Sequence, residues 1–320
     1  MGERRRKESN GGVKMLNTKV LCKCPIQFLQ DNIYGFCTND LVVIGCDSGC
    51  GKSTLSRIIT RQACADGCPV VLYSLENAPG TFVTEQVMME YCKDSGERLN
   101  IRQFEIMHTE NPDKFKQYRQ KVYNDSLRKT PDGLPLLVFH EQVANGDWTI
   151  ERLIASMKEE IAQGYKLFIV DHLDVLGNKN ELENTMIAME RLWNLVQEHG
   201  LCIITFSQIV KNCRALCPSS DDLRGHKAKV YKSTIIITLG KHEYGYYKPP
   251  VAHPYAKPTY VRITKSRGTG SACAICYFDG TRYLETYNDV LCDSPGNFID
   301  GMTREKLQKI KHDQERLGQW

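Results

Sequence analysis

Apolar residues along this chain gather in short runs separated by longer stretches of mixed character. Each run is nearly continuous and rich in aliphatic residues, as strands buried on both faces of a sheet are. The runs are LVVIG (41–45), VVLYSLE (70–76), LLVFH (136–140), LFIVD (167–171) and CIITF (202–206). The stretches between them show helical patterns. The chain therefore predicts an α/β fold, with a parallel sheet core covered by helices on both faces.

Two of the intervening segments have clear helical spacing. Residues 151–164 and 186–200 carry apolar positions at intervals of three and four, and they end in Gly164 and Gly200. Glycine just after the last periodic residue is a common helix stop. We interpret the Met and Leu stripes on these helices as core positions rather than cofactor contacts.

The pattern changes at residue 233. Three strand-like runs follow one another with no helical segment between them: STIIITLG (233–240), TYVRITKSRGTG (259–270) and SACAICYF (271–278). A proline-rich stretch, 245–258, separates the first two. These runs are expected to extend the sheet as C-terminal antiparallel hairpin strands.

Composition narrows the class of protein but does not identify it. The chain is 41% apolar and 25% charged, which is ordinary for a soluble globular protein, and its net charge of +4 is too small to demand a nucleic-acid partner. No apolar run could span a bilayer, and residues 1–14 lack the apolar core of a secretory signal. We expect a cytoplasmic protein of a bacterium or a virus-infected cell, with an organelle matrix as the alternative, and no membrane partner.

The chain has fourteen cysteines, which raises the question of disulfides or zinc. The close pairs do not have the spacing of a zinc ribbon. Cys273 and Cys276 fall in a strand-like run, where residues three apart point to opposite faces. We interpret the cysteines as small buried thiols in a reducing compartment.

The stretch CDSGCGKS (46–53) matches the phosphate-binding pattern G-x-x-x-x-G-K-[ST], except that Cys46 stands where the pattern has glycine. A strand-like run precedes it and a helical segment follows. In such a loop successive backbone N–H groups point at phosphate oxygens, the lysine contacts the β- and γ-phosphates and the hydroxyl binds Mg²⁺. The stretch predicts binding of ATP and Mg²⁺. The nucleotide-binding candidates are Cys46, Asp47, Ser48, Gly49, Cys50, Gly51, Lys52, Ser53 and Thr54.

Polar residues end three of the other apolar runs. Asp171 follows four apolar residues and is expected to hold Mg²⁺ together with Ser53; Asp174 lies beyond the strand and is interpreted as a loop residue. Glu76 could orient the attacking water as a general base, or it could simply begin a helix. Gln208 could sense the γ-phosphate, or it could be an ordinary polar strand end.

Together these motifs resemble the motor domain of replicative ring helicases of the DnaB type and of the primase-helicases of phages and mitochondria. Relatives have ARPSMGKT where this chain has CDSGCGKS, so Cys46 stands where they have alanine. The chain's SLE, IVDHLDVL and FSQI also match family motifs. DDLRG (221–225) resembles TDLRG, and ITKSRGTG (263–270) resembles LKCRFTG. The resemblance covers about 34–285, with six motifs in the family's order.

The resemblance implies a RecA-like ATPase with defined roles for its side chains. Glu76 would be the general base, Asp171 the Mg²⁺ ligand and Gln208 the residue of the glutamine motif. Lys265 and Arg267 would enter the ATP site of a neighbouring subunit, with Arg267 as an arginine finger supplied in trans. The implied assembly is a homo-oligomer, a hexameric ring, that translocates on single-stranded DNA.

In the family, loops facing the central channel bind the DNA backbone. The corresponding segments are 178–184 and 211–232, and the second is more basic here than in relatives, which have Ser-Gly and acidic residues after DLR. Basic side chains there would give salt-sensitive affinity that is independent of sequence. The DNA-binding candidates are Lys179, Lys211, Arg224, Lys227, Lys229 and Lys232.

The expected organisation is a basic flexible arm and linker (1–24), a RecA-like ATPase/helicase motor domain (25–290) and a C-terminal basic tail (291–320). Since residues 1–24 leave no room for a primase, a separate primase or loader is an expected partner. The main hypothesis is an ATP-hydrolysing DNA helicase. Two alternatives remain open: a RecA- or KaiC-like DNA-dependent ATPase without unwinding, and an ATP-binding adaptor for a primase or loader.

Overall fold

The structure, a computed structural model, describes most of the chain between residues 18 and 298. The described ranges are 18–46, 49–142, 148–176, 181–210, 218–241, 256–266, 270–280, 283–288, 292–294 and 297–298. Within them, side chains are not described at 175, 181–184, 226, 241 and beyond 280.

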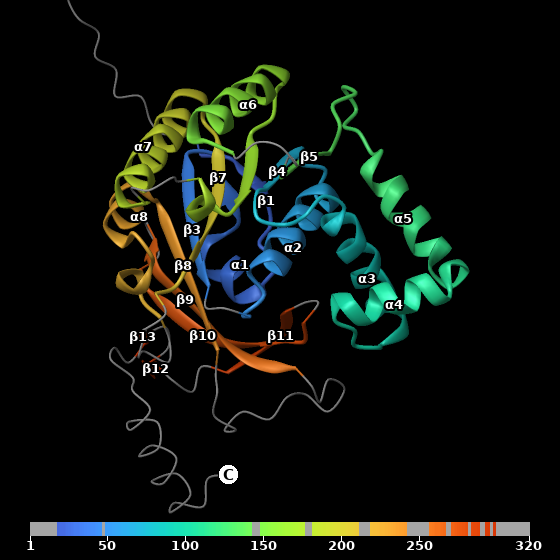
Figure 1. The fold of residues 1–320 in the computed structure, drawn as a ribbon. Helices are drawn as coiled ribbons and strands as arrows, with labels where there is room; N and C mark the ends of the chain where they lie inside the picture. Colours follow the sequence, from blue (N-terminus) through green and yellow to red (C-terminus); the bar gives the residue numbers. More distant parts are fainter. Residues whose placement is uncertain are drawn as a thin grey trace, which may run out of the picture.

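One large sheet forms the centre of the molecule (Figure 1). Among the described residues it has nine strands in the order β11-β10-β9-β8-β3-β7-β6-β4-β5. Six neighbouring strands are parallel, which confirms the predicted core. They are β3 (Asp40–Cys46), β4 (Val70–Ser74), β5 (Leu137–Glu141), β6 (Leu167–Asp171), β7 (Cys202–Gln208) and β8 (Ile235–Lys241).

Antiparallel strands continue the sheet beyond β8, as the sequence predicted. They are β9 (Lys257–Ser266), β10 (Ala272–Phe278) and β11 (Tyr283–Asn288). The strand β8 itself lies parallel to β3, so the antiparallel series begins one strand later than expected. Two small separate sheets are formed by β1 (Val20–Cys22) with β2 (Phe36–Cys37), and by β12 (Cys292–Ser294) with β13 (Asn297–Phe298).

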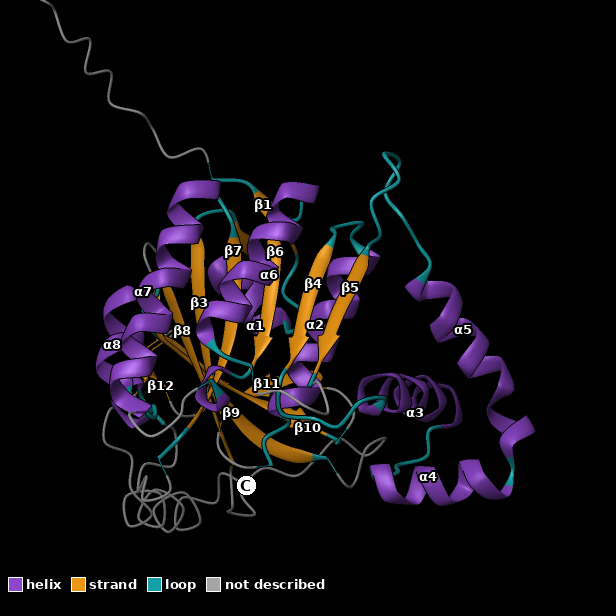
Figure 2. Ribbon diagram, turned by 45° about the horizontal axis from the view of Figure 1, so that its top comes forward, coloured by secondary structure: helices purple, strands orange, loops and turns teal. Residues whose placement is uncertain are grey.

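Helices lie in front of and behind the parallel strands (Figure 2). The strand β3 shows why both faces are covered: Val42 and Ile44 belong to one hydrophobic cluster, and Leu41 and Val43 to another on the opposite face. The first cluster includes residues of α1 (Gln27–Ile33) and α2 (Lys52–Ala65), and the second includes residues of α6 (Ile150–Gln163) and α7 (Glu181–His199). Helices α6 and α7 are followed by Gly164 (φ 109°) and Gly200 (φ 61°), as predicted.

The segment between β4 and β5 forms a helical unit of its own. It contains α3 (Thr81–Ser95), α4 (Ile101–Glu110), a 3₁₀ turn (Pro112–Phe115) and α5 (Lys116–Ser126). Tyr91, Phe104 and Phe115 pack edge to face there, with ring centroids 4.9 Å apart for both Phe115 pairs. This unit stands beside the sheet, with α5 farthest out (Figure 1).

The described cysteines are mostly buried, in agreement with their interpretation as core thiols. Cys273 and Cys276 are 3% and 0% exposed. Burial raises the pKa of the Cys68 thiol to about 12. None of the helices that the structure describes has both the length and the apolar character needed to cross a bilayer.

Candidate active site

The phosphate-binding loop joins β3 to α2 at the carboxyl ends of the parallel strands. Gly49 and Gly51 have φ of 77° and 85°, which favours glycine at both positions. A Cβ atom on Gly51 would also lie 2.4 Å from the ring of Phe278 on β10, so this position has no room for a side chain. The Cys46 and Cys50 side chains are buried at 2% and 1% exposure and would act in phosphate binding only through their backbone. Asp47 and Ser48 lie outside the described residues.

Lys52, the first residue of α2, lies between two carboxylates that come from neighbouring strands. Its Nζ is 2.9 Å from Glu76 Oε2 and 3.6 Å from Asp171 Oδ1. The register explains the meeting, because Ser74 at the end of β4 pairs with Asp171 at the end of β6, and Glu76 follows two residues later. The three residues predicted from separate motifs are therefore brought into one site.

Asp171 has the surroundings of a metal ligand. Its Oδ2 accepts a hydrogen bond from Ser56 Oγ (3.2 Å), whereas its Oδ1 is buried and has no hydrogen-bond partner among the described residues. A buried carboxylate oxygen that accepts no hydrogen bond suits a hard cation such as Mg²⁺, and Ser53 lies close by in the first turn of α2. Ser56 was not predicted, although its position one turn after Ser53 in the sequence is a usable signal.

Glu76 is held in its ionised form, which a general base requires. Burial raises its pKa, but the hydrogen bond and positive charge of Lys52 outweigh burial, and the pKa lies below the ordinary value. His172 Nε2 lies 3.2 Å from Glu76 Oε2. Burial, followed by the charge of Lys52, lowers the pKa of His172 and favours the neutral imidazole. His172 was not predicted as a site residue, despite its place next to Asp171.

Gln208 ends β7 and joins the same group of side chains. Its Nε2 lies 3.4 Å from His172 Nε2, which connects it to Glu76 through a single side chain. The Cα partner of Gln208 on the adjacent strand is Cys46, at the start of the phosphate-binding loop. The predicted glutamine thus lies within the site.

One prediction made from the sequence is confirmed and one is wrong. Asp174 lies beyond the end of β6, as expected, on a 3₁₀ turn (Leu173–Val175), where its side chain is 2% exposed and pairs with Lys229. Lys229 is not available to DNA, because its side chain has no exposed surface. The reason is that His226–Lys232 folds as helix α8 rather than as a loop, and this helix directs Lys229 inward.

The remaining basic candidates have different surroundings. Arg224 and Lys227 are exposed, and Lys232 is half-buried with its Nζ 3.4 Å from Glu190 Oε1 on α7. Lys265 on β9 donates a hydrogen bond to the carbonyl of Val230 on α8, so in the isolated chain it contacts its own subunit. The predicted residues Lys179, Lys211 and Arg267 lie outside the described residues.

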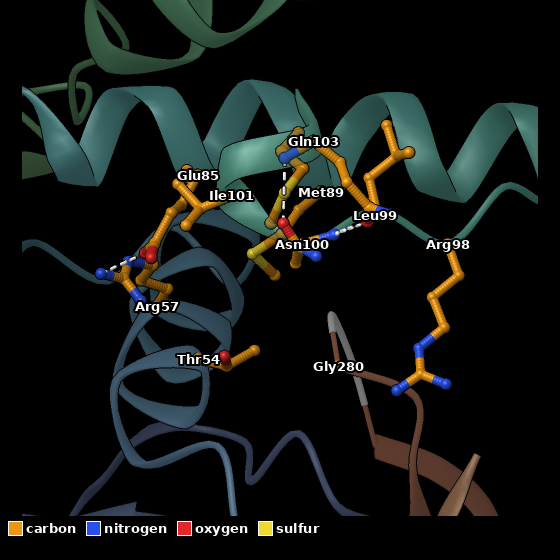
Figure 3. A pocket seen from close by; sticks show the side chains of 11 residues that line it. Thr54, Arg57, Glu85, Met89, Arg98, Leu99, Asn100, Ile101, Gln103 and Gly280 are labelled. Atoms are coloured by element: carbon orange, nitrogen blue, oxygen red, sulfur yellow. Dashed lines mark hydrogen bonds and ion pairs between the residues drawn. The ribbon is translucent and has the colours of Figure 1, made fainter. Parts of the chain in front are cut away.

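A cavity of about 530 Å³ adjoins the first turn of α2 at Thr54, directly after the phosphate-binding loop (Figure 3). Met88 and Met89 of α3 contribute apolar surface, and Arg98 projects beside Gly280. On the other side of the cavity, Arg57 of α2 forms an ion pair with Glu85. Burial raises the pKa of Glu85, and the positive charge of Arg57 offsets this only in part. The volume falls in the range of small-molecule sites.

Known proteins resemble the chain in both sequence and fold. The model of the family described as "DnaB-like helicase C terminal domain" matches residues 23–283, well over half of the 320 residues. Two similar solved structures are an ATPase domain (TM-score 0.66, 13% identity, 83% of this chain and 92% of that chain) and a DnaB-like replicative helicase studied with primase (TM-score 0.65, 13% identity, 83% and 62%). The chain thus spans less than two thirds of the latter. At this identity the likeness establishes the fold. No curated protein matches the chain.

Proposed function

Because this chain belongs to the family of DnaB-like helicase C-terminal domains, we propose that it is an ATP-hydrolysing motor that moves along single-stranded DNA as a ring. The observation that carries the proposal is the meeting of Lys52, Glu76 and Asp171 at adjacent strand ends beside the phosphate-binding loop. Such a group can bind a triphosphate and activate a water molecule. A protein that only holds its partners together needs the first property but not the second.

The chemistry follows from charge and position. Lys52 would bind the β- and γ-phosphates together with the backbone N–H groups of the loop. Mg²⁺, held by Ser53 and Asp171, would supply positive charge against the phosphate oxygens. Glu76, ionised and in contact with His172, would orient the attacking water and take its proton. Gln208 would sense the γ-phosphate.

The cavity beside α2 offers a place for the nucleoside. Thr54 lines the cavity and directly follows Ser53, the residue expected to bind Mg²⁺. The sugar and base of a bound nucleotide would therefore extend into the cavity from Thr54. The Met88 and Met89 side chains supply apolar surface for a base, and Arg98 supplies a cation. Replacing Arg98 with Ala should raise the KM for ATP more than it lowers kcat.

DNA would bind along three basic residues in and just before α8, the exposed Arg224 and Lys227 and the half-buried Lys232, together with the predicted Lys179 and Lys211. A ring would let these segments from several subunits surround one strand. It would also let Lys265 and Arg267 act on a neighbour's ATP, as the family resemblance implies. The proposal includes the motor domain boundaries 25–290, a hexamer and a separate primase or loader as partner.

The test is ATP turnover with and without single-stranded DNA, combined with the mass of the assembled species and strand separation on a forked duplex. The proposal predicts DNA-stimulated turnover by an oligomer that separates strands. Stimulated turnover without separation would favour the RecA- or KaiC-like alternative. ATP binding without turnover would favour the adaptor.

The ring is tested separately by mixing two inactive variants. Arg267→Ala should bind ATP and assemble but hydrolyse poorly, and Lys52→Ala should lack turnover. Mixed rings should recover part of the activity, since an intact loop can then face an intact finger. If mixed rings form and show no recovery, Arg267 is not a finger supplied in trans.

A further inference from the structure

The ion pair between Asp174 and Lys229 has no role in the site described so far. It is buried from both sides, with side-chain exposures of 2% and 0%, and its Nζ–Oδ1 distance is 2.5 Å. The charge of Lys229 and its hydrogen bond hold the pKa of Asp174 below its ordinary value, although burial alone would raise it. A buried pair of this kind is weak evidence for stability, because apolar residues of similar size would serve as well. Its contacts indicate a more specific use.

The ammonium of Lys229 contacts three acceptors on different elements. Besides Asp174, it donates to Ser207 Oγ on β7 (2.7 Å) and to the carbonyl of Arg224 (2.7 Å). Asp174 in turn accepts from the backbone N–H of Gln208 (2.9 Å). The pair therefore joins the end of β7, the turn after β6 and the start of α8 at one point.

The backbone before α8 is fixed to the same strand end. Val210 donates its N–H to the carbonyl of Asp222 (2.9 Å), and Arg224 donates to the carbonyl of Gln208 (3.0 Å). Leu223 between them is fully buried against β3, where a Cβ atom on Gly45 would lie 2.1 Å from Leu223 Cδ2. The absence of a side chain at Gly45 makes this close packing possible.

The other side of Gln208 leads to the ATP site. Its side-chain amide contacts His172 (3.4 Å), His172 contacts Glu76 (3.2 Å), and Glu76 contacts Lys52 (2.9 Å). When Lys52 binds phosphate, its contact with Glu76 would weaken. The contacts of Glu76 with His172, and of His172 with Gln208, would then change in turn. The side chain of Gln208 thus contacts the ATP site through His172. Its backbone N–H donates to Asp174, and its backbone carbonyl accepts from Arg224.

We propose that Asp174 and Lys229 are positioning residues that fix α8 to the strand end carrying Gln208, so that the state of the ATP site sets the position of the basic residues around α8. The proposal deepens the proposed function and rests on it. Neither residue touches nucleotide or DNA. Their effect should appear in the coupling between the two sites rather than in either affinity.

The test compares two lysines of the same helix. Turnover of ATP is measured against the concentration of a long thymidine homopolymer for the wild type, Lys229→Met and Lys232→Met. Lys229→Met should leave the unstimulated rate near that of the wild type and lower the maximal stimulation about tenfold, with little change in the half-saturating DNA concentration. Lys232→Met, which removes an expected phosphate contact, should raise that concentration and keep the maximal rate.

A second variant guards against misfolding. Lys229→Met leaves Asp174 as a lone buried charge, whereas Asp174→Asn with Lys229→Met removes both charges, and Asn can still accept from Gln208. The double variant should fold and show the same loss of stimulation. If either variant folds and reaches the wild-type maximal rate, the positioning role is overturned while the proposed function stands. The same holds if neither variant folds, because the pair would then serve folding alone. If the wild type hydrolyses ATP without stimulation by DNA, the proposed function and this proposal both fail.

Discussion

The ATP site and the start of α8 are both linked to the end of β7, through the side chain and the backbone of Gln208, yet their side chains are placed by different means. At the ATP site, Lys52, Glu76 and Asp171 stand at or just beyond strand and helix ends, and the parallel register brings them together. In the second region, Lys227, Lys229 and Lys232 lie on one short helix, whose rotation decides which of them is exposed. The ends of strands can be predicted from hydrophobic runs in the sequence. The rotation of a short helix cannot, because it depends on the residues against which the helix packs.

The largest difference within the second region should appear in stability. Removing one partner of a buried pair costs ~3–5 kcal/mol, whereas an exposed pair contributes ~0–1 kcal/mol. Lys229→Met should therefore lower the free energy of unfolding by about 3 kcal/mol or more, and Lys232→Met by less than about 1 kcal/mol. Denaturant unfolding of both variants measures this. Equal losses would mean that Lys229 is not buried as described.

This contrast shows how far the sequence alone could predict the molecule. The apolar runs predicted the parallel core and the antiparallel extension, and the family motifs predicted Lys52, Glu76, Asp171 and Gln208. The pairing of Asp174 with Lys229 could not be predicted, since 55 residues separate them and only the fold brings them to hydrogen-bond distance. His172 was missed because a histidine within a strand-to-turn segment has no periodic signal.

The crowding at Gly51 in the phosphate-binding loop can be tested against Gly67, which lies just after the other end of α2. Gly51 and Gly67 both have positive φ, 85° and 73°, but only Gly51 is crowded, by Phe278; around Gly67 no atom of the described chain lies within 4 Å of an added Cβ. Both substitutions to Ala carry the strain of a positive φ, on the order of 1–3 kcal/mol. Gly51→Ala should cost more and should also reduce ATP binding, whereas Gly67→Ala should bind normally. Equal stability losses with normal ATP binding in both would show that Phe278 does not constrain the loop.

The smallest effects are expected from Lys227, which is exposed, and Lys232, which is half-buried. Replacing Lys227 and Lys232 with Ala should weaken binding to any single strand and reduce its salt dependence by roughly one slope unit for each lost phosphate contact. Lys158→Ala, at an exposed lysine on α6, is the matched control and should change neither quantity. An unchanged slope in the double variant would place the DNA path elsewhere.

The central claim is that the adjacent ends of β4 and β6 form a hydrolytic site, with Glu76 as its base. It is tested most directly by measuring ATP affinity and single-turnover hydrolysis for Glu76→Gln beside Glu110→Gln, a matched change at an exposed residue of α4. We predict that Glu76→Gln binds ATP like the wild type and hydrolyses it slower by a factor of ~10² or more, while Glu110→Gln is unchanged. Hydrolysis by Glu76→Gln at the wild-type rate would contradict the account.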